Sequence, residues 1–373
     1  MSHVSNAELE AADIAVLFDR NRLRIARELR GLSQVQLARE AGSVTSGSLS
    51  QFESGHTRPS AATLRRLSVA LRVPLRFFAA PAQPSRPESV SGFFRSLRST
   101  SPRDRQQALA YVQLARELAL ELEKFVTLPE LDLPRTTQPL AEIIKREEIE
   151  ALAQDVRNHW NIPSGPIDDV VRTLERNGIV TIRFRVSLEK VDAFCVDFPD
   201  RPVIALGADK GLRDRSRFDG THELGHLIMH SADQVGTKSI ETQANEFAAA
   251  FLMPAEDIRD ELPARADWPA LLKLKAQWHV SIAALLVRAK TLGVMDEQTY
   301  TQAWKTMSVR GWRKREPGHI GTPESPVLLR RALDVAANTG MTFGNLIGRA
   351  GLPENDIRAI LGDNSDERPR VEL

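Results

Sequence analysis

Two histidines and a glutamate in the segment THELGHLIMH, residues 221–230, have the types and spacing that a zinc site requires. His222 and His226 are four residues apart, so on a helix they share one face, and two imidazoles at this separation can bind one zinc ion. Glu223 projects about 100° away from them, where its carboxylate can take a proton from a water that the metal activates. This spacing favours hydrolytic zinc chemistry, although it also occurs by chance in helices with exposed histidines.

A third zinc ligand is expected from residues 240–254, which read IETQANEFAAAFLMP. Two glutamates compete for the role, Glu241 and Glu246. On a helix Glu241 shares a face, within about 60°, with two alanines and Asn245, whereas Glu246 lies roughly 140° away. We therefore expect Glu241 to complete the site while the alanines allow the two helices to approach closely. Asn245 is expected to hydrogen-bond a ligand histidine and so to orient it.

The elements that must position these residues are a small sheet and a series of helices. Helices are expected from about residue 217 to 310. The segment 268–312 also fits a second helix-turn-helix, but it lacks a basic excess, so we interpret it as a helical subdomain beside the zinc site. Short β-branched or aromatic runs predict strands at Ile179–Phe184, Val191–Asp197 and Val203–Leu206.

Residues 17–80 predict a second kind of site, built on short helices. Gly31 ends one helix, Ser33 caps the next over Gln34–Glu40, and Thr45 or Ser46 caps a helix to about Glu53. A short second helix with small polar residues at its exposed N-terminus is the shape that enters a DNA major groove. Gln34 could reach a phosphate. The residues expected to face base edges are Ser46, Gly47, Ser48 and Gln51.

The distribution of charge also favours nucleic-acid binding at this end. Residues 17–80 carry eleven Arg and four Asp or Glu, a net +7, and residues 81–105 carry five Arg and two acids, a net +3. The chain from residue 106 onward sums to about −6. Such asymmetry is typical of a nucleic-acid face, and a helical module that binds protein is the alternative. Because one recognition helix buries little surface, we expect a homodimer on a palindromic duplex operator.

Length and composition set the wider organisation. A chain of 373 residues is expected to form two or three domains. One cysteine, Cys195, excludes a disulfide framework. No signal peptide or membrane-spanning run is evident, so we expect a cytoplasmic protein without a membrane partner. The predicted regions are a DNA-binding domain at 17–80, a linker and connecting helix at 81–135 (helix 103–125), a zinc domain at 140–312 (first helix 140–159), and a small helical segment at 315–373 (helices within 323–361) with a disordered tail.

The basic end resembles the Xre, or lambda Cro/repressor, helix-turn-helix family. The matching signals are GLSQ at 31–34, LA at 37–38, LSQFESG at 49–55 and Pro59. Ser43 departs from the family pattern as a one-residue insertion in the turn, which bears on the tilt of the recognition helix.

Residues 140–312 resemble the ImmA/IrrE metallopeptidase family. The shared pieces are Arg217 and Phe218 before the two histidines, His230 after them, the block E-x-x-A-N-x-F-A, LMP, and the WHVS and RGW segments. The resemblance implies a gluzincin-like centre with one zinc per chain and limited proteolysis of a repressor. His230 is a candidate oxyanion stabiliser, but a supporting or core histidine is the stronger interpretation. No local pattern places the tyrosine usual in such centres.

The sequence thus predicts a mainly α, α+β protein, with an all-α helix-turn-helix domain, a zincin-like domain with a small sheet, and a helical C-terminal region. Two functions of different classes remain open. The first is a DNA-binding regulator whose zinc metallopeptidase domain cuts a repressor or partner protein. The second is a transcription factor, or an antitoxin, whose peptidase-like domain only senses a ligand, metal or partner. The linker SVSGFFRSLRST, residues 89–100, is a candidate cleavage site in cis, with docking of its apolar residues on the connecting helix the stronger interpretation.

Overall fold

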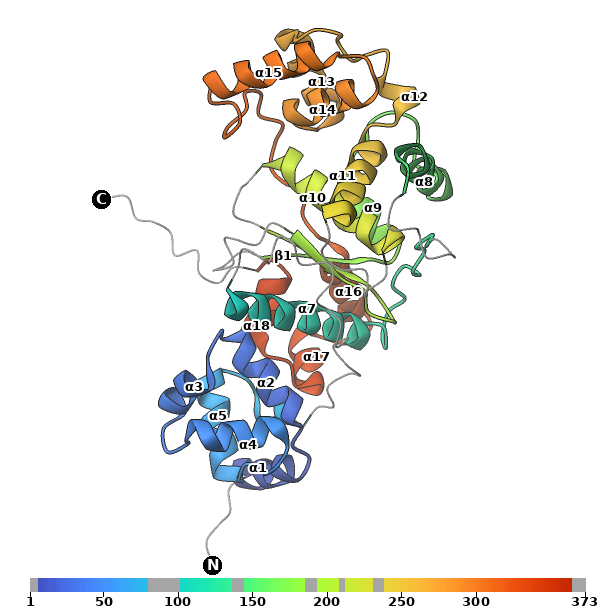
Figure 1. Cartoon of the computed structure of the whole chain (residues 1–373). Helices are drawn as coiled ribbons and strands as arrows, with labels where there is room; N and C mark the ends of the chain where they lie inside the picture. The colour runs from blue at the N-terminus through green and yellow to red at the C-terminus, as the bar shows by residue number, and fades with distance from the viewer. Residues whose placement is uncertain are drawn as a thin grey trace, which may run out of the picture.

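The computed structural model describes residues 6–79, 101–135, 144–184, 193–207, 212–230 and 238–363. The fold is mainly α, α+β, as the sequence predicts, with one three-stranded sheet among these residues (Figure 1). The linker at 89–100, with its candidate cleavage site, and the tail from residue 364 lie outside the described residues.

The N-terminal part is a compact set of short helices. The predicted helix-turn-helix is present, and α1, which the sequence interpretation did not include, packs against α5 and places Ile14 in the core. The helices are α1 Asn6–Val16, α2 Arg20–Leu29, α3 Gln34–Ala41, α4 Ser46–Ser54 and α5 Ala61–Leu71, followed by a 3₁₀ turn at Leu75–Phe78.

Local sequence explains how α3 and α4 begin and end. Ser33 and Gln36 form a capping box at the start of α3. Thr45 caps α4, since its Oγ1 accepts a hydrogen bond from Ser48 N at 3.0 Å. Gly42 and Ser43 both have positive φ, 57° and 53°, so the chain turns left-handed for two consecutive residues. The inserted Ser43 is therefore accommodated inside the turn.

The connecting helix α7, Pro102–Leu122, lies between the N-terminal helices and the sheet (Figure 1). It ends three residues earlier than predicted, because a turn follows at residues 123–125. It contacts α2 on one side and β1 and β3 on the other. One cluster of buried apolar residues continues from the N-terminal helices through α7 to one face of the sheet. The N-terminal helices and the sheet thus share a core.

The sheet has the strand order β1-β3-β2, with β1 parallel and β2 antiparallel to β3. All three strands were predicted. β3 has the predicted bounds, β1 is one residue shorter at each end, and β2 ends one residue earlier than predicted; residues 191 and 192, at its predicted start, lie outside the described residues. Alternate residues face opposite ways: Val180 and Ile182 face the α7 side, whereas Cys195 and Ile204 belong to the core under α10. The strands are β1 Val180–Arg183, β2 Ala193–Val196 and β3 Val203–Leu206.

The second face of the sheet is covered by helices that carry the candidate metal ligands. α10 contacts β2 and β3, α11 packs along α10, and α8 packs along α11. α10 begins four residues before the predicted 217, and α8 begins at residue 146, the stretch 136–143 lying outside the described residues. The helices are α8 Arg146–His159, α9 Val170–Arg176, α10 Arg213–Met229, α11 Lys238–Leu252 and α12 Ala255–Ile258.

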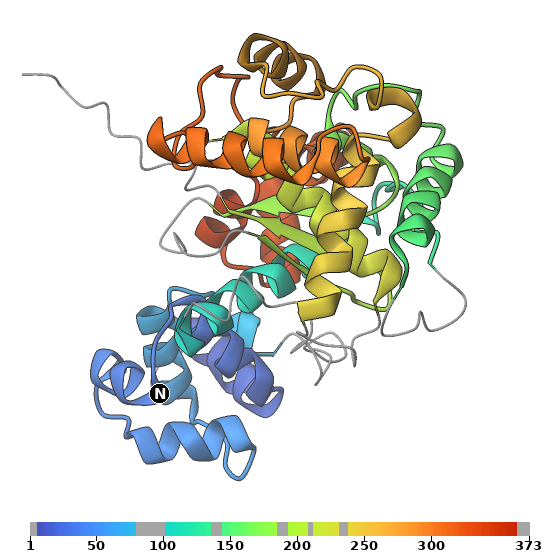
Figure 2. The same cartoon turned by 45° about the horizontal axis from the view of Figure 1, so that its top comes forward.

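A helical subdomain lies next to the ends of α10 and α11 (Figures 1 and 2). It contains α13 Trp268–Trp278, α14 Ile282–Thr291 and α15 Glu297–Val309. α13 and α14 meet at 102°, an angle typical of a helix-turn-helix. However, α14 lines a cavity together with residues of α10 and α11, which agrees with a subdomain beside the candidate zinc site. No single described helix is long and apolar enough to cross a membrane, and α13 with α14 passes that test only as a bent pair.

The C-terminal helices are integrated with the rest of the molecule. α16 Leu328–Asn338, α17 Phe343–Ala350 and α18 Glu354–Ile360 all pack on α7. The Asp356 carboxylate accepts two hydrogen bonds of 2.7 Å from Arg30, which follows α2. The Glu324 carboxylate accepts hydrogen bonds from Val170 N and Val171 N in α9. This region therefore bridges the N-terminal helices and the sheet domain.

Candidate functional site

The two helices that carry the candidate metal ligands pack unusually closely at Gly225. A Cβ atom at this position would lie 3.1 Å from Phe247 Cδ1 in α11, closer than most real contacts. The alanines expected to permit close approach, Ala244 and Ala248, are fully buried. The absent side chain at Gly225 thus complements the small residues of α11 and sets the distance across which Glu241 reaches the histidines.

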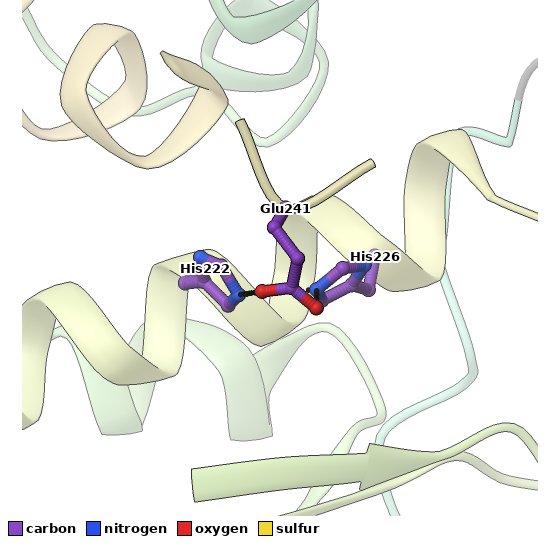
Figure 3. A group of neighbouring side chains, drawn as sticks. All are labelled: His222, His226 and Glu241. Carbon is purple, nitrogen blue, oxygen red and sulfur yellow. Dashed lines mark hydrogen bonds and ion pairs between the residues drawn. The ribbon is translucent and has the colours of Figure 1, made fainter. Parts of the chain in front are cut away.

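His222, His226 and Glu241 converge, each offering one ligand atom, with all three atoms within 4.8 Å of one another. The two Nε2 atoms are 3.0 Å apart, and the Glu241 carboxylate lies 3.5 Å from His222 Nε2 and 4.0 Å from His226 Nε2. Figure 3 shows the carboxylate reaching from α11 toward both imidazoles of α10. Two imidazoles and one carboxylate are a common catalytic zinc set.

The outer nitrogen of each histidine is held by a neighbour. Asn245 Oδ1 lies 3.0 Å from His222 Nδ1. His226 Nδ1 lies 3.0 Å from His230 Nδ1, and His230 Nε2 lies 2.9 Å from Gln243 Oε1. Because an amide oxygen only accepts, His230 donates from Nε2 and accepts at Nδ1, so His226 donates from Nδ1. This series of hydrogen bonds leaves the Nε2 of His226 unprotonated, with its lone pair available to a metal ion.

Burial and charge act differently on the three histidines. Burial lowers the pKa of His226 well below its usual value, and charge on His222 and His230 would lower it further. Burial also lowers the pKa of His230. Burial opposes protonation of His222 too, but hydrogen bonding to Glu241 and the charge of Glu223 raise its pKa above the usual value. His226 and His230 are therefore favoured in the neutral form that ligation and its support require.

Glu223, between the two histidines in sequence, is buried, 4% exposed, and contacts the sheet through β2. It hydrogen-bonds Cys195 of β2, and burial raises the pKa of Glu223 to about 7. Its Oε2 has no hydrogen-bond partner among the described residues. A buried oxygen without a partner, next to three converging ligands, fits a metal centre in which a water would complete the set.

Glu246, the rejected candidate ligand, lies elsewhere. Its Oε1 accepts hydrogen bonds from Arg146 at 2.9 and 3.0 Å, on the side of α11 that faces α8. Sequence reasoning missed Gln243 and the contact of Cys195 with Glu223. Gln243 could not be found from a local pattern, because its partner His230 is 13 residues away in sequence and follows the end of α10. For Cys195, the alternation of strand residues toward α10 was a usable signal.

The predicted DNA-contacting residues cluster at the start of α3 and along α4. Gly47 and Gln51 are exposed, and Ser46 and Ser48 are half-buried. The Ser48 hydroxyl lies 2.9 Å from Thr45 Oγ1, so part of its capacity serves the cap. Gln34 donates to Glu53 Oε2 at 3.0 Å.

Glu53 also pairs with Arg27 of α2, through contacts of 2.6 and 2.8 Å. Glu53 therefore links α2, α3 and α4 through its hydrogen bonds, and the amide of Gln34 is already hydrogen-bonded within the protein. Two further exposed polar residues of these helices were not among the predictions: Arg39 of α3 and Ser50 of α4.

Comparison with known families agrees with both the predicted helix-turn-helix region and the predicted metallopeptidase-like region. Residues 174–290 match the family model described as an IrrE N-terminal-like domain, and residues 23–78 match the model described as a helix-turn-helix. A comparison with curated proteins found no match. The first span contains every candidate metal-site residue, and the second contains every predicted DNA-contacting residue.

Proposed function

Because this chain joins an Xre-like helix-turn-helix domain to an IrrE N-terminal-like domain, we propose that it is a DNA-binding transcription regulator that performs limited, zinc-dependent proteolysis of a repressor or partner protein. The observation that carries the proposal is the convergence of His222, His226 and Glu241 beside the buried Glu223.

The proposed chemistry assigns each residue a role. His222, His226 and Glu241 would hold one zinc ion per chain. When bound, zinc polarises the scissile carbonyl and lowers the pKa of a coordinated water. Glu223 takes the proton of the attacking water at Oε2 and delivers it to the leaving amine. Asn245 and the His230–Gln243 pair orient the two imidazoles, so that their Nε2 lone pairs face the metal position.

For DNA binding, we propose that α4 enters the major groove of a palindromic duplex as part of a homodimer. Gly47 and Gln51 present the exposed edge of α4, and the N-terminal end of the protein carries the arginine excess. On contact with DNA, Gln34 would exchange Glu53 for a phosphate oxygen. Electrophoretic mobility shifts over a salt series test this, since phosphate contacts predict affinity that falls steeply with salt.

Incubation of the zinc-loaded full-length chain with casein and with candidate repressors, followed by fragment mass analysis, tests the proteolysis. Glu223→Gln is the matched control, because it keeps the three ligands and removes the proton acceptor. The proposal predicts defined fragments with the wild type and intact substrates with the variant. Intact substrates with both proteins would contradict a protease function.

The shared core supports a second candidate, in which metal occupancy alone controls DNA binding. Arg22 of α2 and Glu117 of α7 form an ion pair of 2.6 Å with both side chains at most 5% exposed. A change at the sheet could therefore reach the DNA-binding helices through α7. Duplex affinity of Glu223→Gln measured with and without zinc separates the two: a zinc-dependent change without hydrolysis favours sensing, and no change contradicts it.

A further inference from the structure

Two cavities, of about 760 and 470 Å³, have lining residues within about one helical turn of the candidate metal ligands: Phe218 and Asp219 before His222, and Asn245 after Glu241. Both are bounded by Phe218, one helical turn before His222, and by Trp304 of α15. The smaller is also lined by Asn245, the residue bonded to His222. The two cavities share the wall residues Phe218, Ser281, Ala283, Ala284 and Trp304 and are lined by residues of α10, α11 and the subdomain α13–α15; we call the two together the groove.

The larger cavity is cationic. Six of its lining side chains are Arg or Lys and three are Asp or Glu. All three acids are already engaged. Lys275 donates to Asp214 and Glu316 at 2.7 Å each. Asp219 pairs with Arg215 at 3.9 Å.

The uncompensated charge comes from the run Arg313, Lys314 and Arg315, just after α15. All three residues are exposed, and none forms an ion pair with another described residue. The Arg313 guanidinium lies over the Trp304 ring, 5.5 Å from its centroid. The cavity therefore offers several cations that a bound anionic group could pair with.

The spacing along α10 relates this cavity to the metal centre. Arg215, which lines the cavity, precedes His222 by seven residues, or about 10 Å of helix axis. An extended chain covers that distance in about three residues. A peptide held with its scissile bond over the histidines would therefore place a side chain about three positions away in the cationic cavity.

We propose that the groove selects a substrate with acidic residues about three positions from the scissile bond, on one side of it. This inference rests on the proposed protease function and names its substrate class. It also bears on cleavage in cis: the linker SVSGFFRSLRST contains Arg95 and Arg98 and no Asp or Glu. The charge of the groove disfavours this segment, so the substrate is a separate, acidic stretch of chain.

Peptide binding to zinc-loaded, full-length Glu223→Gln tests the inference without requiring hydrolysis. The probes are fluorescent peptides of equal length and apolar content, carrying Glu or Lys at the second, third and fourth positions on one side of the central bond, and the linker sequence itself. Each exposed ion pair contributes up to about fivefold, so two or more predict about tenfold tighter binding of the Glu peptide at low salt. The linker peptide should bind as weakly as the Lys peptide.

Charge reversal at the cavity provides the decisive comparison. Lys314→Glu with Arg315→Glu should abolish or invert the preference, and Lys314→Gln with Arg315→Gln should reduce it. Lys273→Glu is the matched control, since Lys273 is exposed on α13 and lines neither cavity. Circular dichroism verifies that each variant is folded.

Three results would overturn the inference: equal binding of the Glu and Lys peptides, an unchanged preference after charge reversal, or tighter binding of inorganic pyrophosphate than of the Glu peptide. Wild-type hydrolysis is measured separately. An acidic preference in binding without any hydrolysis would reject the protease function and leave the charge selectivity standing. Hydrolysis without charge preference would support the protease function and reject the charge selectivity.

Discussion

Replacement of Gly225 by alanine should weaken zinc binding without touching any ligand. The added methyl group would lie 3.1 Å from Phe247 Cδ1 and 3.3 Å from two further Phe247 atoms. Phe247 is fully buried and stacked on Phe251, so it has little room to move. The helix α11 must therefore shift away from α10, and Glu241 shifts with it.

The expected magnitudes follow from two opposing effects. Alanine stabilises a helix interior by about 1 kcal/mol relative to glycine. Overpacking a rigid core typically destabilises by about 1–3 kcal/mol. The net change in the free energy of unfolding should thus be a loss of about 0–2 kcal/mol. Displacement of one of three ligands should lower zinc affinity by about tenfold or more.

Gly220→Ala is the matched control on the same helix. A Cβ atom there would meet its nearest neighbours, side-chain atoms of Leu174, Leu206 and Val170, at 3.7–3.8 Å, which is ordinary contact. This variant should gain about 1 kcal/mol and keep its zinc. Chelator competition gives the zinc affinities, and urea denaturation gives the stabilities. If Gly225→Ala bound zinc as tightly as Gly220→Ala, the argument from helix spacing would be refuted.

Three further predictions concern pH, domain docking and DNA contact. Burial raises the pKa of Glu175 from 4.5 to about 7, so the folded state holds a proton that the unfolded chain releases, and stability should fall as pH rises through this window. Glu175→Gln should remove up to about 3 kcal/mol of this pH-dependent loss of stability between pH 5 and pH 8, as measured by urea denaturation. If the free energies of unfolding of the variant and the wild type fell in parallel with pH, the assignment would be contradicted. Asp356→Ala removes the carboxylate that Arg30 and Tyr111 share, and should destabilise the protein by about 3 kcal/mol, with earlier proteolysis near α18. A stability within error of wild type would refute a structural role for this link. Gln51→Ala should weaken operator binding by about 1–3 kcal/mol with little effect on random duplex, as measured by anisotropy, and an equal loss on both duplexes would show that Gln51 does not read bases.

Local sequence patterns predicted much of this structure. Caps and turn residues placed α3 and α4 nearly to the residue, and β-branched runs located all three strands. Helical spacing separated Glu241 from Glu246, and the structure places the first beside the histidines and the second beside Arg146. These features depend on residues within one or two helical turns of one another, which a sequence displays directly.

The remaining features depend on contacts between distant parts of the chain. Arg30 and Asp356 pair across 326 positions, and no pattern near either residue indicates the other. The same holds for Glu324, which accepts hydrogen bonds at the start of α9. The cationic cavity also arises only when α10 and the end of α15 come together. Tertiary packing therefore decides how the C-terminal helices and the groove are used.

Zinc content of the purified protein tests the central claim most directly. The account predicts about one zinc per chain in the wild type and in Glu246→Gln, and loss of the metal in Glu241→Gln and His222→Ala. Glu246→Gln is the matched control, because it changes the same residue type on the same helix. A wild type that binds no zinc, or a Glu241→Gln variant that keeps full occupancy, would contradict the metal centre on which the proposed proteolysis depends.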